Sequence, residues 1–493
     1  MKRALTLLLA VLSAGCAYYN AMWSAERYAK DARRAERRGQ TAEARSHWAQ
    51  AAAKAERVAI RHPRSRWADD ALTLQAEGLA RSGSCDQTGE VIKHVRETVS
   101  DRVLLERVSL VDAECALIAQ QPAQAQAAVG PALASKDESR RSRAELLAGQ
   151  AAAALLDYDG AVAHFERSRE TAARPALARV QIAADRPAEA TRVIESLTGE
   201  EYAGDRPDLL TRLAAAAGPP AASTALDRLL ARGKRIELQE QCRLLIADAD
   251  RRFANGDYDV AAERYQRAAT LAPVGTSEAG QAALGTQRVL LTGASHRADL
   301  KPIESALARL SLEPGAVGAK RLLDLVRQVA IVPETPAAGF RAAEFARDSL
   351  SAPALAGSLF LEVADRDTAS IYASKALVAA ISMLPDRRDS IVAVLDARYA
   401  TAPYTRAFHG EASIAYAAAE DSLARELGVQ IVRSVVPLAG RRVDMPLPGP
   451  RGPHLEDVEE ARGAVRGRAL PANRPAAAAG RDRPPTPTGP ERP

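Results

Sequence analysis

Cys16 closes a run of residues that has the layout of a secretory signal peptide. Lys2 and Arg3 supply the positively charged start, an apolar stretch follows, and the small residues 13–15 stand directly before the cysteine. The apolar stretch is shorter than the ~20 residues that a membrane-spanning helix needs. The run therefore predicts export across a membrane and places a thiol directly after the cleavage site.

This run resembles the bacterial lipobox, in which the cysteine becomes the first mature residue and carries the lipid. Leu12 lies one position further from the cysteine than is usual for that motif. The resemblance implies a multiply acylated Cys16, and several chains anchor firmly because each buried methylene contributes about 0.8 kcal/mol. Ala17 stands where an aspartate commonly retains such lipoproteins at the inner membrane, so the resemblance implies an outer-membrane protein that faces the periplasm. The alternative is an ordinary signal peptide, or a short anchor, followed by an unrelated cysteine.

Cys85 and Cys115 are the next candidates for covalent chemistry. The sequence predicts one helix over 87–98 and another over 102–119, with a turn near Ser100. In an antiparallel hairpin, residues at equal distances from the turn lie side by side, and each cysteine is fifteen residues from position 100. In the oxidising periplasm the pair could form a disulfide, and the alternative is two separate buried thiols. Cys242 has no such partner, and we expect it to be a buried, small apolar side chain.

The remaining polar side chains carry no catalytic signature. The sequence has no glycine-rich phosphate loop, no HExxH motif and no Gly-x-Ser-x-Gly turn. Its seven histidines are dispersed, and only His409, beside Gly410 and Glu411, has a suggestive setting. The adjacent Asp69 and Asp70 fit the first turn of a helix, where the dipole favours acidic residues, better than a catalytic pair. We therefore expect no enzyme activity, no metal and no cofactor.

Trp23, Trp48 and Trp67 all lie in the first 70 residues. They could form an aromatic docking patch near the membrane end of the molecule. The alternative, favoured because tryptophan is usually well buried, is that they fill the core of the first repeats.

Composition predicts that helices position these residues. Aromatic residues make up only 4% of the chain, too few for a sheet-rich protein, while alanine, leucine, arginine and glutamate favour helix. The formal net charge is +5, but residues 16–436 carry as many acidic as basic side chains. A neutral body lacks the electrostatic footprint of a nucleic-acid-binding protein, so we expect no nucleic-acid partner.

One segment shows a clear repeat pattern around Gly256, which permits a tight turn between two helices. The residues after the turn recur at three- and four-residue steps, which places them on one face of the second helix, and a proline ends that helix. These residues are Tyr258, Ala261, Tyr265, Ala268 and Pro273. A weaker copy consists of Gly149 in the first helix and of Tyr158, Ala161 and Phe165 in the second.

The segment from Phe253 to Pro273 resembles the tetratricopeptide repeat. The resemblance implies an all-α solenoid of helical hairpins, in which each hairpin buries its apolar face against its neighbours. The run from His62 to Leu72, in which Ser65 can cap a helix, resembles the linker between repeats in the periplasmic lipoprotein of the outer-membrane barrel-assembly machinery. This second resemblance covers only the N-terminal repeats, and the chain is longer than such a protein needs to be.

The composition changes near Pro437. Twelve of the 28 prolines and ten arginines lie from there onward, which predicts a disordered tail. The tail could touch an acidic partner or the cell wall, and the alternative is a solvated terminus. The predicted organisation is a signal peptide over 1–15, a lipidated tether over 16–24, helical repeats over 25–234 and 235–431, and a Pro/Arg-rich tail over 437–493.

Together these features predict a lipid-anchored periplasmic scaffold that binds other envelope proteins or extended peptides through its repeats. The resemblance to the assembly lipoprotein favours a role in envelope or outer-membrane assembly. One alternative is a docking or regulatory subunit for peptidoglycan enzymes, and an enzyme of this kind would need an acid–base pair within residues 337–428. Another alternative is a cell-wall tether that acts through the basic tail.

Overall fold

The computed structural model describes most of the chain between residues 22 and 427. The described ranges are 22–36, 40–233, 236–313, 315–366, 368–411 and 414–427. The predicted signal peptide, Cys16 and the tail over 437–493 lie outside these ranges. The predicted tether over 16–24 ends earlier than expected, because residues 22–24 already belong to the first helix, where Met22 is buried.

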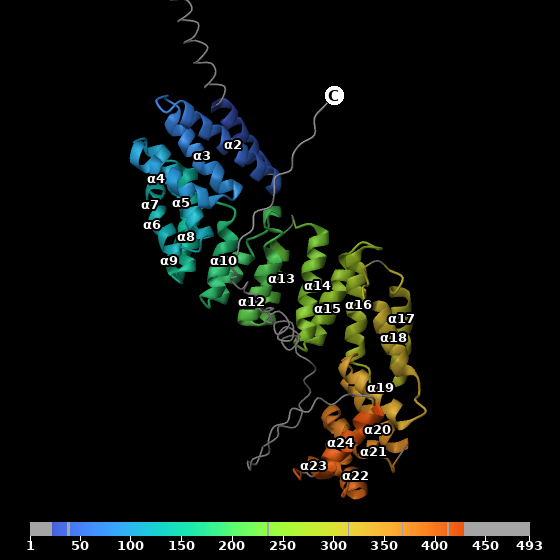
Figure 1. The fold of residues 1–493 in the computed structure, drawn as a ribbon. Coiled ribbons are helices and arrows are strands. Elements are labelled where there is room, and N and C mark those ends of the chain that lie inside the picture. Colours follow the sequence, from blue (N-terminus) through green and yellow to red (C-terminus); the bar gives the residue numbers. More distant parts are fainter. Residues whose placement is uncertain are drawn as a thin grey trace, which may run out of the picture. The chain divides into compact units, whose positions relative to one another are not determined.

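Helices are the only extended regular elements of the described residues, which confirms the all-α prediction (Figure 1). Short turns connect consecutive helices, and most helices pack against the next one along the chain as antiparallel pairs. A helix over 22–36 is followed by α2 (Thr41–Arg61), α3 (Ala68–Ser82), α4 (Thr88–Thr98), α5 (Arg102–Ile118), α6 (Pro122–Ala128), α7 (Gly130–Leu133), α8 (Glu138–Ala154), α9 (Tyr158–Arg167), α10 (Ala173–Ala183), α11 (Pro187–Ile194), α12 (Arg206–Ala217), α13 (Pro219–Arg232), α14 (Leu238–Ala254), α15 (Tyr258–Leu271) and α16 (Ser277–Thr292). The later helices are α17 (Leu300–Leu310), α18 (Ala319–Ala330), α19 (Pro336–Asp348), α20 (Pro353–Arg366), α21 (Ile371–Met383), α22 (Arg388–Tyr399), α23 (Pro403–Phe408) and α24 (Ile414–Leu427).

Several helices begin where the sequence supplies a cap or a proline. Asp101 accepts a hydrogen bond from the backbone N–H of Val103 at 2.7 Å, and Asp157 accepts one from Gly160 at 2.9 Å. Proline occupies the start of α11, α13 and α19, where the helix has no use for a backbone N–H. These local signals explain why the helix boundaries follow the sequence closely.

The predicted Ser65 cap is wrong. Helix α3 begins at Ala68, which directly follows Trp67 in the sequence. Ser65 Oγ has no hydrogen-bond partner. The backbone of residues 62–68 forms two consecutive turns, with Ser65 N–H donating to His62 and Ala68 N–H donating to Ser65. With these turns, Trp67 takes the position directly before the helix, and no side chain caps its first turn.

Small residues bring the first helices close together. Ala51 and Ala55 of α2 are fully buried in the cluster that also contains Leu74 of α3. A Cβ at Gly78 of α3 would lie 2.8 Å from the carbonyl oxygen of Trp48, so this position requires glycine. Alanine and glycine at these contacts let the helices approach until backbone nearly meets backbone.

The chain divides into two compact units, called unit 1 and unit 2 below. Unit 1 is Met1–Leu290 with Ser305–Leu323, and unit 2 is Leu291–Glu304 with Asp324–Pro493. The expected division of the repeats at residues 234 and 235 falls inside unit 1. One hydrophobic cluster spans that position, because it contains Leu229 of α13 and Leu244 of α14.

A series of ion pairs links equivalent helices of successive hairpins in unit 1. Arginine and glutamate meet between α3 and α5, α5 and α8, α12 and α14, and α14 and α16. The pairs are Arg107–Glu77 at 2.8 Å, Arg140–Glu106 at 3.1 Å, Arg206–Glu240 at 2.5 Å and Arg243–Glu278 at 3.0 Å. Their partners lie 30 to 35 residues apart in the sequence, which is close to the length of one helical hairpin. We call this series the arginine ladder.

Candidate functional site

The residues of the repeat pattern lie where the hairpin of α14 and α15 needs them. Gly256 has a positive φ of 83° in the turn, a conformation that favours glycine. Ala261 and Ala268 are fully buried, and Tyr265 is buried with its hydroxyl donating to Asp250 at 2.5 Å. Tyr258 and Pro273 complete the pattern at the start of α15 and beyond its end. The pattern therefore builds the hairpin, with Ala261, Tyr265 and Ala268 committed to its core.

The weaker copy is built in the same way. A Cβ at Gly149 of α8 would lie 2.6 Å from the ring of Phe165, so the glycine makes room for the aromatic side chain of α9. Ala161 and Phe165 are buried, while Tyr158 packs at the edge of their cluster. Gly285 of α16 likewise leaves space for the ring of Tyr265, since a Cβ at this glycine would lie 2.3 Å from that ring. Glycine opposite an aromatic ring is therefore a recurring packing device in unit 1.

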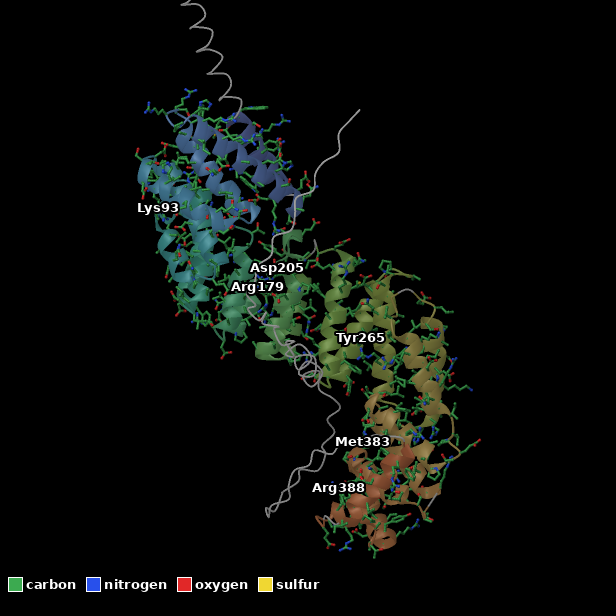
Figure 2. All side chains as sticks on the ribbon, in the orientation of Figure 1. Lys93, Arg179, Asp205, Tyr265, Met383 and Arg388 are labelled. Carbon is green, nitrogen blue, oxygen red and sulfur yellow. A yellow bond between two sulfur atoms is a disulfide. The ribbon has the colours of Figure 1, made fainter. Side chains whose placement is uncertain are left out.

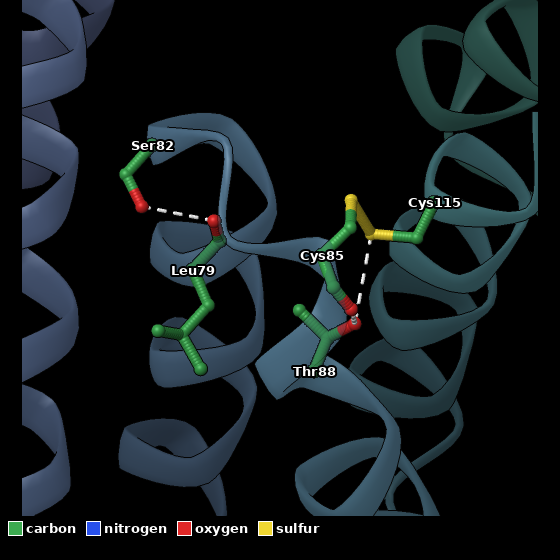
Figure 3. Close-up of a disulfide and its surroundings, with 5 residues drawn as sticks. All are labelled: Leu79, Ser82, Cys85, Thr88 and Cys115. Atoms are coloured by element: carbon green, nitrogen blue, oxygen red, sulfur yellow. Dashed lines mark hydrogen bonds between the residues drawn. A yellow bond between two sulfur atoms is a disulfide. The ribbon is translucent and has the colours of Figure 1, made fainter. Parts of the chain in front are cut away.

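The structure joins Cys85 and Cys115 in a disulfide (Figure 3). Cys85 lies in the short helix η1 (Cys85–Gln87) just before α4, and Cys115 lies in the last two turns of α5. Thr88 Oγ1 donates to the Cys85 carbonyl at 2.7 Å and lies 3.6 Å from Cys115 Sγ. Helices α4 and α5 follow the predicted ranges closely, and Cys242 is a buried free thiol whose pKa is raised by burial.

A pocket of unit 1 lies at the connection between α11 and α12. Its volume is about 490 Å³. Its walls are the connection itself, the first turn of α10 and the last turn of α13. The lining residues are Arg174, Ser196, Leu197, Thr198, Gly199, Glu201, Tyr202 and Arg232. Guanidinium groups, hydroxyl groups and exposed backbone make this wall strongly polar.

A buried arginine holds the connection in place. Arg206 is fully buried at the start of α12. Its Nε donates to the carbonyl of Leu197 at 2.7 Å, and another of its nitrogens donates to the carbonyl of Gly199. The remaining nitrogen pairs with Glu240 of α14 at 2.5 Å. Three fixed hydrogen bonds on one side chain give this pocket a preformed wall.

The pocket carries an excess of positive charge. Arg174 forms no ion pair with any residue that the structure describes. Arg232 shares the nearly buried Glu195 with Arg228, at 3.2 Å and 3.8 Å. Glu201 is the single acidic side chain of the lining. With Glu195 and Arg228 included, three guanidinium groups meet two carboxylates, and this excess of one positive charge suits the pocket to a further negative group.

Neighbouring charges keep the pocket walls rigid. Arg179 of α10 reaches across to Asp205 at 2.5 Å and to Asp208 of α12 at 3.2 Å, as the labelled side chains of Figure 2 show for the first pair. Tyr202 has a pKa raised by burial and, less strongly, by Glu201, so its hydroxyl stays protonated at neutral pH. The pocket therefore offers both charged and neutral hydrogen-bond donors.

Sequence reasoning did not identify this pocket. Asp205, Arg206 and Pro207 look like the exposed start of a helix, and nothing in their local sequence marks Arg206 as buried. Its partners lie 7, 9 and 34 residues away. Only the 34-residue spacing, which equals one repeat, offered a sequence signal.

The other polar candidates have structural explanations. Asp69 is exposed in the first turn of α3, while burial raises the pKa of Asp70. His409 Nε2 lies 2.6 Å from Asp396 on an exposed surface, with the ring of Phe408 beside it. No group of side chains in the described ranges could hold a metal ion.

Unit 2 contains a smaller cavity of about 280 Å³ between α19 and α20. Glu362 in its wall is paired with Arg297 at 3.2 Å, and Arg366 donates to the carbonyl of Pro333 at 3.0 Å. The described residues of the range 337–428, where an acid–base pair would have to lie, form the helices α19–α24. No described helix is long and apolar enough to cross a membrane.

Comparison with known proteins gives fold-level likenesses only. No family model matches the chain, and no curated protein sequence matches it. Among solved structures, it is similar to a tetratricopeptide repeat protein from Parabacteroides merdae, with a TM-score of 0.30 and 14% identity over 53% of this chain and 99% of that one. It is also similar to a Rap protein in complex with competence and sporulation factor, with a TM-score of 0.25 and 12% identity over 67% of this chain and 99% of that one.

Proposed function

We propose that this protein is a lipid-anchored interaction scaffold of the bacterial envelope, attached to the outer membrane through Cys16 and facing the periplasm. The predicted signal peptide and Cys16 are the evidence for the lipid anchor. The helical hairpins are the evidence for a scaffold, since stacked hairpins offer extended surfaces for partners. The resemblance of residues 62–72 to the linker of the assembly lipoprotein supports a role in envelope or outer-membrane assembly.

The preformed basic pocket between α11 and α12 carries the proposal of partner binding. Arg174 and Arg232 would receive an acidic side chain of an extended peptide, and the Tyr202 hydroxyl would supply a neutral hydrogen-bond donor beside them. Arg206 holds the carbonyl groups of Leu197 and Gly199, and with them the connection, in place before the partner arrives, which lowers the entropic cost of binding. The partner is therefore a protein with an exposed acidic segment.

The first experiment is a crosslinking pull-down of the full-length lipidated protein from whole envelopes, with Cys16→Ala as the control for anchoring. Recovery of outer-membrane β-barrel proteins or their assembly factors supports the scaffold in membrane assembly. Recovery of peptidoglycan enzymes or wall fragments in their place supports the docking or tethering alternatives. Loss of sacculus binding on deletion of residues 437–493 would single out the tether.

The pocket is tested in the same pull-down. Arg174→Gln with Arg232→Gln should reduce recovery of the partner at least about ten-fold, because each charge-assisted hydrogen bond contributes about 1.5–3 kcal/mol. Arg192→Gln is the matched control, since Arg192 lies on the same hairpin but pairs with Glu189 at the surface and does not line the pocket. Equal recovery by the pocket variant and the control would contradict the pocket as the binding site.

A further inference from the structure

The three tryptophans of the first helices have different surroundings. Trp48 is fully buried, donates from Nε1 to Glu36 at 2.8 Å, and lies between the guanidinium groups of Arg33 and Arg81. Trp67 is half-buried at the edge of the same cluster. Trp23 is 51% exposed, although it belongs to the first turn of a helix that is otherwise well packed. The core prediction therefore holds for Trp48 and does not account for Trp23.

Trp23 shares its end of the molecule with other exposed side chains. Met22 and Val58 belong to one hydrophobic cluster, which places the start of the first helix beside the last turns of α2. Ile60, in those last turns, is 70% exposed, and Trp67 follows in the connection to α3. An aromatic ring and a branched aliphatic side chain are thus left uncovered at one end of the first hairpin.

The same end is rich in unpaired arginine. The ten residues from Arg57 to Arg66 include four arginines and no acidic residue. All four are exposed, and none forms an ion pair with a described residue. With Arg27, five exposed arginines lie at this end. The exposed acidic side chains nearby are only three: Glu26, Glu56 and Asp69. We call this surface the basal patch; its residues are Trp23, Arg27, Arg57, Ile60, Arg61, Arg64, Arg66 and Trp67.

Two of the arginines lie over the rings of the exposed Trp23 and the half-buried Trp67. The guanidinium carbon of Arg27 is 5.5 Å from the ring centre of Trp23, and that of Arg66 is 4.8 Å from the ring centre of Trp67. An arginine stacked on tryptophan presents an apolar ring and a phosphate-binding cation side by side. This combination suits the boundary between acyl chains and headgroups, where tryptophan is enriched.

We propose that the basal patch lies against the headgroups of a membrane that contains anionic phospholipid. The proposal rests on the lipid anchor of the proposed function, because only six residues lie between Cys16 and Trp23 and the chain between them spans at most about 25 Å. The anchor therefore holds Trp23 close to the bilayer, and the arginines supply the attraction to anionic lipid. The patch fixes the direction in which the first hairpin leaves the membrane.

The test uses the full-length lipidated protein in vesicles of phosphatidylethanolamine and phosphatidylglycerol, some of them brominated near the top of the acyl chains. Bromine quenches tryptophan fluorescence only at short range. We expect clear quenching of the wild-type protein and a loss of at least half of that quenching in Trp23→Phe. Trp48→Phe is the matched control and should leave the quenched signal unchanged, because Trp48 is buried in the protein.

A second variant tests the charge. Replacing Arg57, Arg61, Arg64 and Arg66 by glutamine should reduce quenching at least two-fold. Glutamine at the exposed Arg169, Arg186, Arg192 and Arg212 of unit 1 should not change it. Protein that floats with the vesicles but shows no quenching of Trp23 overturns the proposal and leaves the anchor intact. Protein that does not float with the vesicles overturns the anchor and this proposal together.

Discussion

The two units bury different chemistry in their cores. Seven charged side chains are buried among the described residues, and all seven belong to unit 1: Glu106, Glu145, Glu195, Arg206, Asp248, Arg264 and Glu278. Unit 2 instead buries a group of aromatic rings, in which Phe340 lies 5.1 Å from Phe360 and 5.7 Å from Tyr372. The same helical hairpins are thus joined by paired charges in one unit and by ring packing in the other.

This difference between the units follows from the regular spacing of the helices in unit 1. In unit 1, equivalent helices recur at nearly constant spacing, so an arginine on one helix meets a carboxylate one repeat away and the arginine ladder can form. Asp248 shows how fully such charges are satisfied: it accepts from Ser223 Oγ at 2.8 Å and pairs with Arg264 at 3.2 Å. Arg264 in turn binds both carboxylate oxygens of Asp227 at 2.6 Å. Paired charges of this kind specify one alignment of neighbouring hairpins, whereas apolar contacts tolerate several.

The largest expected effect comes from the aromatic core of unit 2. Phe360→Ala should lower the free energy of unfolding of unit 2 by about 4 kcal/mol, because it removes a fully buried ring and leaves a cavity. Hydrogen exchange with mass spectrometry should show faster exchange in α19–α21 and unchanged exchange in α2–α14. Ile414→Ala is the control, since Ile414 is exposed. Equal destabilisation of both units would contradict separate cores.

Removal of the disulfide should lower the stability of unit 1 alone. Replacing Cys85 and Cys115 by serine should cost roughly 3.5 kcal/mol in the chain-entropy model, given the separation of 30 residues. Tryptophan fluorescence reports this loss directly, because all three tryptophans lie in unit 1. Dithiothreitol should shift the urea midpoint of the wild-type protein and leave that of the double variant where it is.

The arginine ladder is tested at its fully buried member. Arg206→Leu should destabilise unit 1 by about 3 kcal/mol, because it leaves the Glu240 carboxylate and two carbonyl groups without their donor. Arg212→Leu on the same helix removes an exposed pair with Asp208 and should cost at most about 0.5 kcal/mol. Urea unfolding followed by pulse proteolysis compares the two variants. Similar midpoints would show that the ladder contributes no more than surface pairs do.

Acid should change the contributions of Glu106 in unit 1 and Glu344 in unit 2 in opposite directions. The Ser135 hydroxyl, with Arg102 and Arg140, holds the pKa of Glu106 in unit 1 below its ordinary value despite burial. This contribution to stability is complete above the ordinary glutamate pKa and is lost as the pH falls through the folded pKa. Burial raises the pKa of Glu344 in unit 2, so its contribution is complete below the ordinary value and is lost as the pH rises through the folded pKa.

The measurement is pulse proteolysis in urea at a series of pH values from neutral to acid, with fragments of each unit identified by mass spectrometry. Glu106→Gln should cost unit 1 about 1–2 kcal/mol at neutral pH and flatten its acid dependence. Glu344→Gln should flatten the rise in the stability of unit 2 that protonation of Glu344 causes toward lower pH. A change of the pH profile in the same direction by Glu106→Gln and Glu344→Gln would contradict the assignment.

The smallest loss of stability is expected from alanine at a turn glycine, and this loss should be the same in both units. Gly256 of unit 1 and Gly410 of unit 2 have φ values of 83° and 88°, and a Cβ at either would meet open space. Alanine at each should therefore cost about 1 kcal/mol through backbone strain alone. Gly89→Ala, in helical conformation on the exposed face of α4, should instead stabilise by about 0.5 kcal/mol. Unequal costs at Gly256 and Gly410 in thermal unfolding would show that the turns differ beyond their backbone.

Local signals explain how closely the sequence predicts α4, α5 and the hairpin of α14 and α15. A capping aspartate, a glycine turn and an apolar face with helical spacing each act within a few residues, so they can be recognised without the fold. The Ser65 cap shows the limit of such reasoning, because the two turns of residues 62–68 depend on how Trp67 packs against the first cluster. The same limit applies to Arg206, whose burial depends on partners up to 34 residues away.

The sequence by itself determined that the described chain is helical, that hairpins repeat, that Gly256 makes a turn, and that Ala261, Tyr265 and Ala268 form one packed face. These features depend on helix propensity and on spacing along a single helix. Only the tertiary structure decided which charges are buried, which tryptophan stays at the surface, and where the chain divides into two units. Those outcomes depend on contacts between residues far apart in the sequence, and burial is a property of the packed helices, not of any one of them.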